Sequence, residues 1–174
     1  PAAIIVEPIQ SGAGIIVPPE GYFKRMKQYC EERGMLLIFD EAQTSFRTGT
    51  NFAFEQEDII PDILTASKTI GAGIPLAVTM TSPDIEQTCH ERGFIYYTSH
   101  ISDPLPAYVG LAVIKTIQDE NLNRQAKEKG ERIINGLKSL QEKYDIIGDV
   151  RGRGLLIGIE FVKDRETKEP ALDE

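Results

Sequence analysis

Short apolar runs alternate with amphipathic stretches along the chain. The run at 35–39 is apolar on both faces, which is typical of a strand buried in a parallel sheet. Before it, apolar residues recur every three or four positions from Tyr22 onward, which predicts a helix that Gly34 ends with a left-handed cap. Further strands are expected at 4–6, 63–65 and 75–80, and a further helix at 83–93 that begins with an N-cap serine and a proline.

The second half of the chain has helical periodicity. Apolar positions keep helical spacing over 105–144, with a break near 119–121. The segment 155–162 then predicts the start of a separate β element. Strands that alternate with helices through short connections predict an α/β layered fold with a mostly parallel sheet.

Composition and charge exclude several classes of protein. The chain has 174 residues, of which 19 are Lys or Arg and 27 are Asp or Glu, so its net charge of −8 argues against binding duplex nucleic acid. Its apolar runs are far too short to span a membrane. Two cysteines form neither a disulfide framework nor a metal-ligand pattern, which favours the reducing cytoplasm. Because the sequence opens without Met and stops in a polar stretch, we expect it to be a segment of a longer protein.

Three charged residues follow predicted strands. In parallel sheets, ligands bind outside the carboxyl ends of the strands, which directs attention to Glu7, Asp40 and Lys68. A carboxylate such as Asp40, at the end of the most hydrophobic strand, is costly unless it meets a cation or several donors. The alternative interpretation of Asp40 is a turn cap or a structural salt bridge.

Lys68 lies among small residues, directly after a predicted strand and before the glycines at 71 and 73. A lysine is usually a solvated surface charge, but a partly desolvated amine is the kind that forms a Schiff base. The two glycines lack the spacing of a dinucleotide-binding fingerprint, and no serine and histidine form a nucleophile elbow. A lysine that binds an aldehyde and an acid that faces a ring nitrogen are the pair that pyridoxal phosphate enzymes use.

The motifs around these residues resemble a known family. The stretches 38–44, 47–49, 61–63 and 67–76 resemble the class III aminotransferases, which are fold-type I enzymes dependent on pyridoxal 5′-phosphate. Within that family, 97–106 and 147–156 are most similar to the 2,2-dialkylglycine decarboxylases. The resemblance implies that residues 1–145 are part of the large cofactor-binding domain and that 146–174 begin the C-terminal small domain.

The resemblance also implies roles for individual residues. Lys68 would bind the cofactor aldehyde and move protons at the substrate carbon, while Asp40 would pair with the pyridinium nitrogen. Gln43 would contact the 3-hydroxyl side of the ring, and Ser99 would reach the phosphate of the neighbouring subunit. Glu7 would line the substrate side of the site.

Two further expectations follow from the resemblance. Oxygens of Ser99, Ile101 and Asp103 would ligate a monovalent cation, potassium or sodium, because oxygen-only ligation suits a hard cation. Gly12, on the substrate side, stands where the decarboxylases carry a serine. The loop 44–49 is one residue shorter than its family counterpart and lacks two early glycines.

The implied activity is decarboxylation and transamination of 2,2-dialkylglycines with amino transfer to pyruvate. The alternative enzyme is an ω-amino-acid or acetylornithine-type aminotransferase. The non-enzymatic alternative is an inactive segment without a complete cofactor site. Small amino acids and 2-oxo acids would be the substrates, and the assembly would be a homodimer or a dimer of dimers. Neither nucleic acid nor membrane is expected as a partner. The arginine for the substrate carboxylate and the aromatic that stacks on the ring would belong to other parts of the protein.

Overall fold

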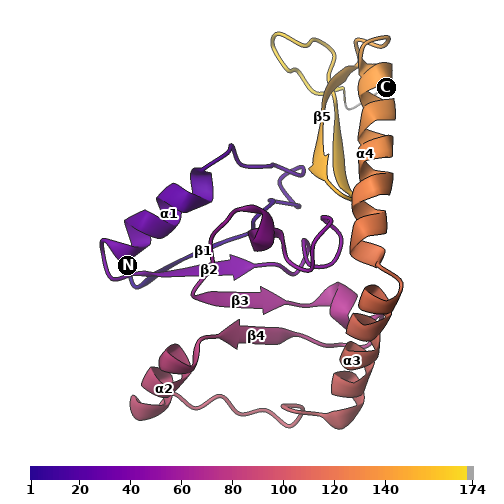
Figure 1. Ribbon diagram of the computed structural model, residues 1–174. Helices are drawn as coiled ribbons and strands as arrows, with labels where there is room; N and C mark the ends of the chain where they lie inside the picture. The colour runs from indigo at the N-terminus through magenta and orange to yellow at the C-terminus, as the bar shows by residue number, and fades with distance from the viewer. Residues whose placement is uncertain (172–174) are drawn as a thin grey trace.

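The computed structural model describes residues 1–171, which form a four-stranded sheet with helices around it and a separate two-stranded hairpin (Figure 1). The strands are β1 (Ala3–Val6), β2 (Leu36–Asp40), β3 (Ile63–Ala66), β4 (Val78–Thr81), β5 (Ile147–Arg153) and β6 (Leu156–Phe161). The helices are α1 (Tyr22–Glu31), α2 (Pro83–Glu91), α3 (Pro104–Asp119) and α4 (Leu122–Gln141), with two short 3-10 turns, η1 (Ala53–Gln56) and η2 (Lys68–Gly71).

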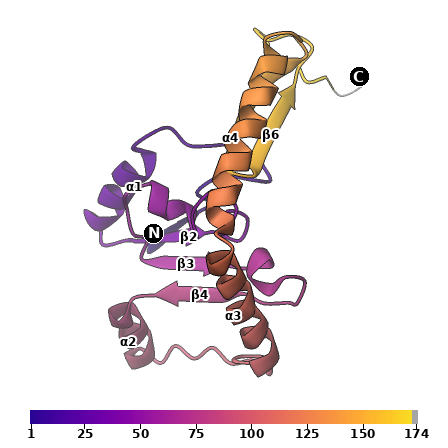
Figure 2. The ribbon, with the colours of Figure 1, turned by 45° about the vertical axis from the view of Figure 1, so that its right-hand side comes forward.

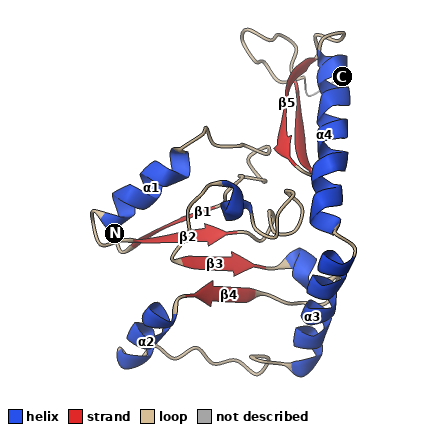
Figure 3. Ribbon diagram, in the orientation of Figure 1, coloured by secondary structure: helices blue, strands red, loops and turns tan. Residues whose placement is uncertain are grey.

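The main sheet has the order β1-β2-β3-β4 (Figure 3). Its first three strands are mutually parallel, and β4 is an antiparallel edge strand. The prediction of an α/β fold with a mostly parallel sheet is therefore confirmed. Because β1, β2 and β3 run in one direction, their carboxyl ends meet at one edge of the sheet.

The two faces of this sheet differ in how well they are covered. On one face, Phe23 and Cys30 of α1 pack against Leu37 and Phe39 of β2 in a fully buried cluster. Side chains alternate between the faces, so Asp40 lies on the opposite face. On that face Ile5 of β1 is 65% exposed, so the described residues cover only one face of the sheet.

The long helical region divides where the pattern breaks. Asn121 takes a left-handed conformation with φ 51° and separates α3 from α4. In Figure 2, α3 lies beside the main sheet and α4 runs along the β5–β6 hairpin. Among the described residues, no helix is both long and apolar enough to cross a membrane.

The boundaries of several elements differ from the expectation. The strand predicted at 75–80 is β4 and begins three residues later, and α4 ends before position 144. The Ser82 cap is confirmed, since its Oγ accepts the Ile85 N–H over 3.4 Å. The β element expected at 155–162 is preceded by the unpredicted β5, its antiparallel partner. The domain boundary at 145/146 stays a prediction.

Candidate active site

The carboxyl ends of β1, β2 and β3 lie at one edge of the main sheet (Figure 1), and their bounds place the three strand-end residues there. Glu7 follows β1 directly, Asp40 is the last residue of β2, and Lys68 follows β3 as the first residue of η2. Since these three strands are parallel and adjacent, the fold gathers two carboxylates and one amine at their carboxyl ends. This edge is the candidate active site.

Asp40 is held by one of its carboxylate oxygens. Its register partner on β3 is Thr65, whose hydroxyl donates to Oδ1 over 3.2 Å, and the Ala42 N–H donates to the same oxygen over 3.0 Å. Within residues 1–171, Oδ2 accepts no hydrogen bond. Asp40 therefore caps a turn, in agreement with the alternative interpretation of this residue. Its Oδ2 oxygen stays available at the sheet edge.

Lys68 lies on a strained backbone. Its φ is 55°, in the left-handed region that side chains with a Cβ rarely adopt. The side chain is exposed, and its Nζ makes no ion pair within the described part of the chain. Strain of this kind persists only where the surroundings over-determine it, and it occurs often at active sites.

Glu7, Gly12 and Gln43 lie in the connecting segments that follow β1 and β2. Glu7 accepts hydrogen bonds from the Ser11 N–H over 3.3 Å and from the Ser11 hydroxyl over 3.2 Å. Gly12 is exposed, and a Cβ built on it would meet open space. Gln43 is half-buried in the turn after β2, where its amide makes no hydrogen bond to residues 1–171.

A second group of predicted residues lies elsewhere in the fold. Ser99, Ile101 and Asp103 belong to the segment between α2 and α3, and no hydrogen bond or ion pair of the described residues joins them to Asp40 or Lys68. Asp103 contacts His100 instead, at 3.6 Å. No cluster of three or more His, Cys, Asp or Glu among the described residues is arranged to hold a metal ion. Of the predicted cation ligands, only Asp103 is one of these residue types, and the role of Ser99, Ile101 and Asp103 stays a prediction.

A large cavity, which the sequence did not reveal, connects η2 with this segment. It measures about 960 Å³ and is mostly apolar, with Ile70 of η2 on one side and Ile101 and Asp103 on the other. The cavity is therefore adjacent to the η2 turn, which begins at Lys68.

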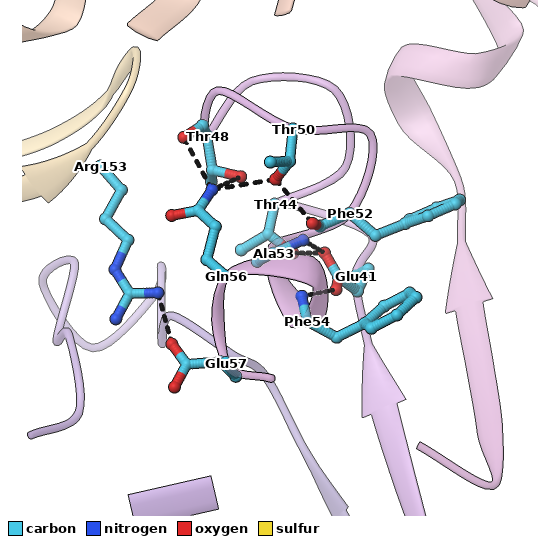
Figure 4. Close-up of polar contacts among 10 residues, drawn as sticks. All are labelled: Glu41, Thr44, Thr48, Thr50, Phe52, Ala53, Phe54, Gln56, Glu57 and Arg153. Carbon is cyan, nitrogen blue, oxygen red and sulfur yellow. Dashed lines mark hydrogen bonds and ion pairs between the residues drawn. The ribbon is translucent and has the colours of Figure 1, made fainter. Parts of the chain in front are cut away.

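Glu41 was not recognised as important from the sequence. It is fully buried and accepts three hydrogen bonds: from the Thr44 hydroxyl over 2.6 Å and from the N–H groups of Ala53 and Phe54 over 2.7 and 2.9 Å (Figure 4). Burial nevertheless raises the pKa of Glu41 above its ordinary value, because it disfavours the charged form. This carboxylate fixes the loop that follows Asp40.

The same loop contacts the turn at Lys68. Phe46, with φ 63°, is buried against Ile70 of η2 and Ile117 of α3. On the other side of the loop, the Gln56 amide donates to the Thr48 carbonyl over 3.0 Å (Figure 4). A bulky residue in a left-handed conformation is tolerated here because its ring joins the apolar cluster.

We expect Glu41→Gln to lower the free energy of unfolding by about 2 kcal/mol at pH 7. The glutamine amide nitrogen cannot accept a hydrogen bond, so it faces donors from Thr44, Ala53 or Phe54 without satisfying them. Urea unfolding of the full-length protein measures the loss. Glu142→Gln, which alters an exposed carboxylate that makes no hydrogen bond or ion pair among the described residues, is the control, and equal stability of the Glu41 variant and the wild type would contradict the prediction.

The raised pKa of Glu41 also sets the sign of a pH effect. The folded protein holds a proton on Glu41 more tightly than the unfolded chain does, and this tighter proton binding stabilises the fold. The stabilisation is fully present below pH 4.5, the ordinary pKa of a glutamate, and is lost as the pH rises through the raised pKa of Glu41 in the folded protein. The stability difference between wild type and the glutamine variant is therefore expected to be larger below pH 4.5 than at pH 7.

Comparison with known proteins places this geometry in context. A family model described as aminotransferase class-III matches residues 1–174. An uncharacterized aminotransferase of Schizosaccharomyces pombe is 51% identical over 171 residues, which is 98% of this chain and 38% of that protein. A leucine/methionine racemase of Thermococcus litoralis is 42% identical and is matched over 99% of this chain and 39% of its own length.

A solved structure is similar to this chain as well. An amine transaminase from an uncultivated Pseudomonas species, in its PLP-bound form, superposes with a TM-score of 0.92 at 34% identity. The match covers 97% of this chain and 40% of the transaminase. The chain thus spans about two fifths of the length of the proteins that it matches.

Proposed function

The chain belongs to the class-III aminotransferase family, and from this premise we propose that it supplies part of the active site of an enzyme dependent on pyridoxal 5′-phosphate. The observation that carries the proposal is the placement of Asp40 and Lys68 at the ends of adjacent parallel strands. An acid and an amine at one sheet edge suit a charged heterocycle that bears an aldehyde.

The residues present fit this cofactor. The Oδ2 oxygen of Asp40 has no partner within residues 1–171 and is able to accept a hydrogen bond from the protonated ring nitrogen. The Lys68 amine, also without an ion pair in the described part of the chain, would bind the aldehyde carbon. When bound, the cofactor withdraws electrons from the substrate carbon, which stabilises the charge left when CO2 or a proton departs.

Each residue then has a task that its position supports. Asp40 keeps the ring nitrogen protonated, and the Thr65 hydroxyl and Ala42 N–H fix the direction of its carboxylate. Lys68 would accept and deliver the proton at the substrate carbon. Gln43 is proposed to lie at the 3-hydroxyl side of the ring, while Glu7 lines the substrate side from the end of β1.

We propose that the reaction is decarboxylation of 2,2-dialkylglycines coupled to amino transfer to pyruvate. The support is the similarity of 97–106 and 147–156 to the decarboxylases. The alternative is an ω-amino-acid or acetylornithine-type aminotransferase, which Gly12 favours because the decarboxylases carry a serine there. Space around Gly12 is open, so a missing side chain leaves the substrate side less defined.

Incubation of the full-length enzyme with 2-aminoisobutyrate and pyruvate tests the reaction. We expect CO2, acetone and alanine in equal amounts, and a lower rate when choline replaces potassium, because Ser99, Ile101 and Asp103 are proposed to ligate a monovalent cation. Gas release and amino-acid analysis measure the products. Transamination of ordinary amino acids without CO2 release would favour the alternative aminotransferase. Absence of turnover with both 2-aminoisobutyrate and ordinary amino acids would exclude both proposed reactions.

We also propose that a second copy of the chain covers the segment that contains Ser99. This segment is apolar and exposed, with Ile95 84% and Tyr97 86% accessible, and Tyr108 of α3 continues it. Exposed apolar surface of this extent is typical of a protein interface. In a homodimer or a dimer of dimers, Ser99 would then reach the cofactor phosphate of the neighbouring subunit.

The free thiols Cys30 and Cys89 accord with a cytoplasmic enzyme.

A further inference from the structure

Arg47, in the loop after β2, connects the turn at Lys68 with the β5–β6 hairpin. Its guanidinium donates from Nη2 to the Thr69 hydroxyl over 2.5 Å, and Thr69 is the residue directly after Lys68. Its backbone carbonyl accepts the Leu155 N–H over 2.9 Å, at the corner between β5 and β6. One residue thus bonds to the candidate cofactor-binding turn and to a distant element of the chain.

The turn at Lys68 needs such support from outside. The η2 turn is four residues long, begins at the left-handed Lys68 and ends beside Ala72, which is also left-handed at φ 45°. Two such residues make the turn costly on its own, and a single 3-10 turn supplies few internal hydrogen bonds to hold it. Ile70 is anchored by its contact with Phe46, so the Arg47–Thr69 bond is the polar counterpart of that apolar anchor.

The hairpin corner is fixed closely to the same loop. Gly154 contacts the backbone of Arg47 and Thr48, and a Cβ on Gly154 would overlap both. Arg153, one residue earlier, forms an ion pair with Glu57 at the end of η1 (Figure 4). A shift of the hairpin corner would therefore displace the backbone of Arg47, because the two backbone segments are in close contact.

We propose that Arg47 is a positioning residue that holds the amine of Lys68 in its working orientation and makes that orientation depend on the docking of the β5–β6 hairpin. The inference rests on the proposed function, because the consequence of a misplaced Lys68 is a misplaced cofactor. Arg47 acts through Thr69 and touches neither cofactor nor substrate in this scheme.

A pair of variants at position 69 tests the polar link in the full-length enzyme. Thr69→Val keeps the shape of the side chain and removes the acceptor, whereas Thr69→Ser keeps the hydroxyl. With the cofactor bound, we expect the valine variant to shift the pH midpoint of the cofactor's visible absorbance by about half a unit or more, and the serine variant to restore it. In the cofactor-free enzyme, we expect the valine variant to change the acylation rate of Lys68 several-fold, measured by peptide mass spectrometry.

A second pair tests the coupling to the hairpin. Gly154→Ala displaces the corner without altering Thr69, and we expect it to change the acylation rate of Lys68 in the same direction. Gly136→Ala, on an open face of α4, is the matched control and should leave the rate unchanged. Arg47→Lys, which retains a donor on a flexible chain, is expected to fall between wild type and Thr69→Val.

The two levels of the argument fail in different ways. Absence of borohydride trapping on Lys68 in the wild-type enzyme would overturn the proposed function. Trapping on Lys68, together with an unchanged midpoint and an unchanged acylation rate in Thr69→Val, would overturn the positioning role alone. An unchanged acylation rate in Gly154→Ala would overturn the coupling to the hairpin.

Discussion

Replacement of Lys68 with alanine is expected to abolish turnover, with kcat lower by about 10⁴-fold or more. The variant would lose both the group proposed to bind the cofactor aldehyde and the base proposed to move the proton at the substrate carbon. Steady-state assays with 2-aminoisobutyrate and pyruvate measure the loss. The side chain is exposed and makes no ion pair in the described part of the chain, so we expect no loss of thermal stability in the cofactor-free enzyme.

The matched control is Lys143→Ala, which removes an exposed lysine after α4 and should leave kcat unchanged. Addition of a small primary amine is expected to restore part of the activity of Lys68→Ala, because a free amine can take over the proton transfer. A Lys68→Ala enzyme with a tenth of the wild-type kcat would contradict the assignment of this lysine.

The second large effect is expected for Asp40→Asn, with kcat lower by about 10²- to 10³-fold. The asparagine oxygen still accepts the hydrogen bonds from Thr65 and Ala42, so the turn is preserved. Its amide replaces the free Oδ2 and has no negative charge to keep the ring nitrogen protonated. Assays of kcat, together with thermal unfolding, should therefore show a loss of activity with little loss of stability.

Thr65→Val is the control for this variant, because it removes a bond that orients the carboxylate and leaves its charge. We expect a several-fold decrease in kcat for the valine variant, well short of the effect of Asp40→Asn. Equal effects of the two variants would mean that orientation, rather than charge, explains the role of Asp40. Full activity of Asp40→Asn would contradict its pairing with the ring nitrogen.

Local patterns in the sequence predicted the main sheet and the edge that carries the candidate active site. The apolar runs before Asp40 and Lys68 are short and bounded by turn residues, so the strands, and with them both strand-end positions, followed from one rule about parallel sheets. Strand β5 escaped prediction because Gly148 and Gly152 interrupt its alternation. Both glycines are required by packing, since a Cβ would overlap Val162 at the first and Leu156 at the second.

The missed parts of the site depend on contacts between distant positions. Glu41 is buried only because the loop returns and presents the N–H groups of Ala53 and Phe54, twelve and thirteen positions later. The Arg47–Thr69 bond joins residues 22 positions apart, and neither side chain is unusual in its local sequence. Periodicity and strand-end rules carry no information on such pairings.

The half-covered sheet determines how this segment behaves when produced by itself. Ile5 and its neighbours on the open face would enter water together, and the antiparallel edge strand β4 would offer unpaired backbone groups beside them. Self-association would then compete with folding as soon as the polypeptide leaves the ribosome. Expression of these 174 residues by themselves is therefore expected to give protein that collects in inclusion bodies or on chaperones.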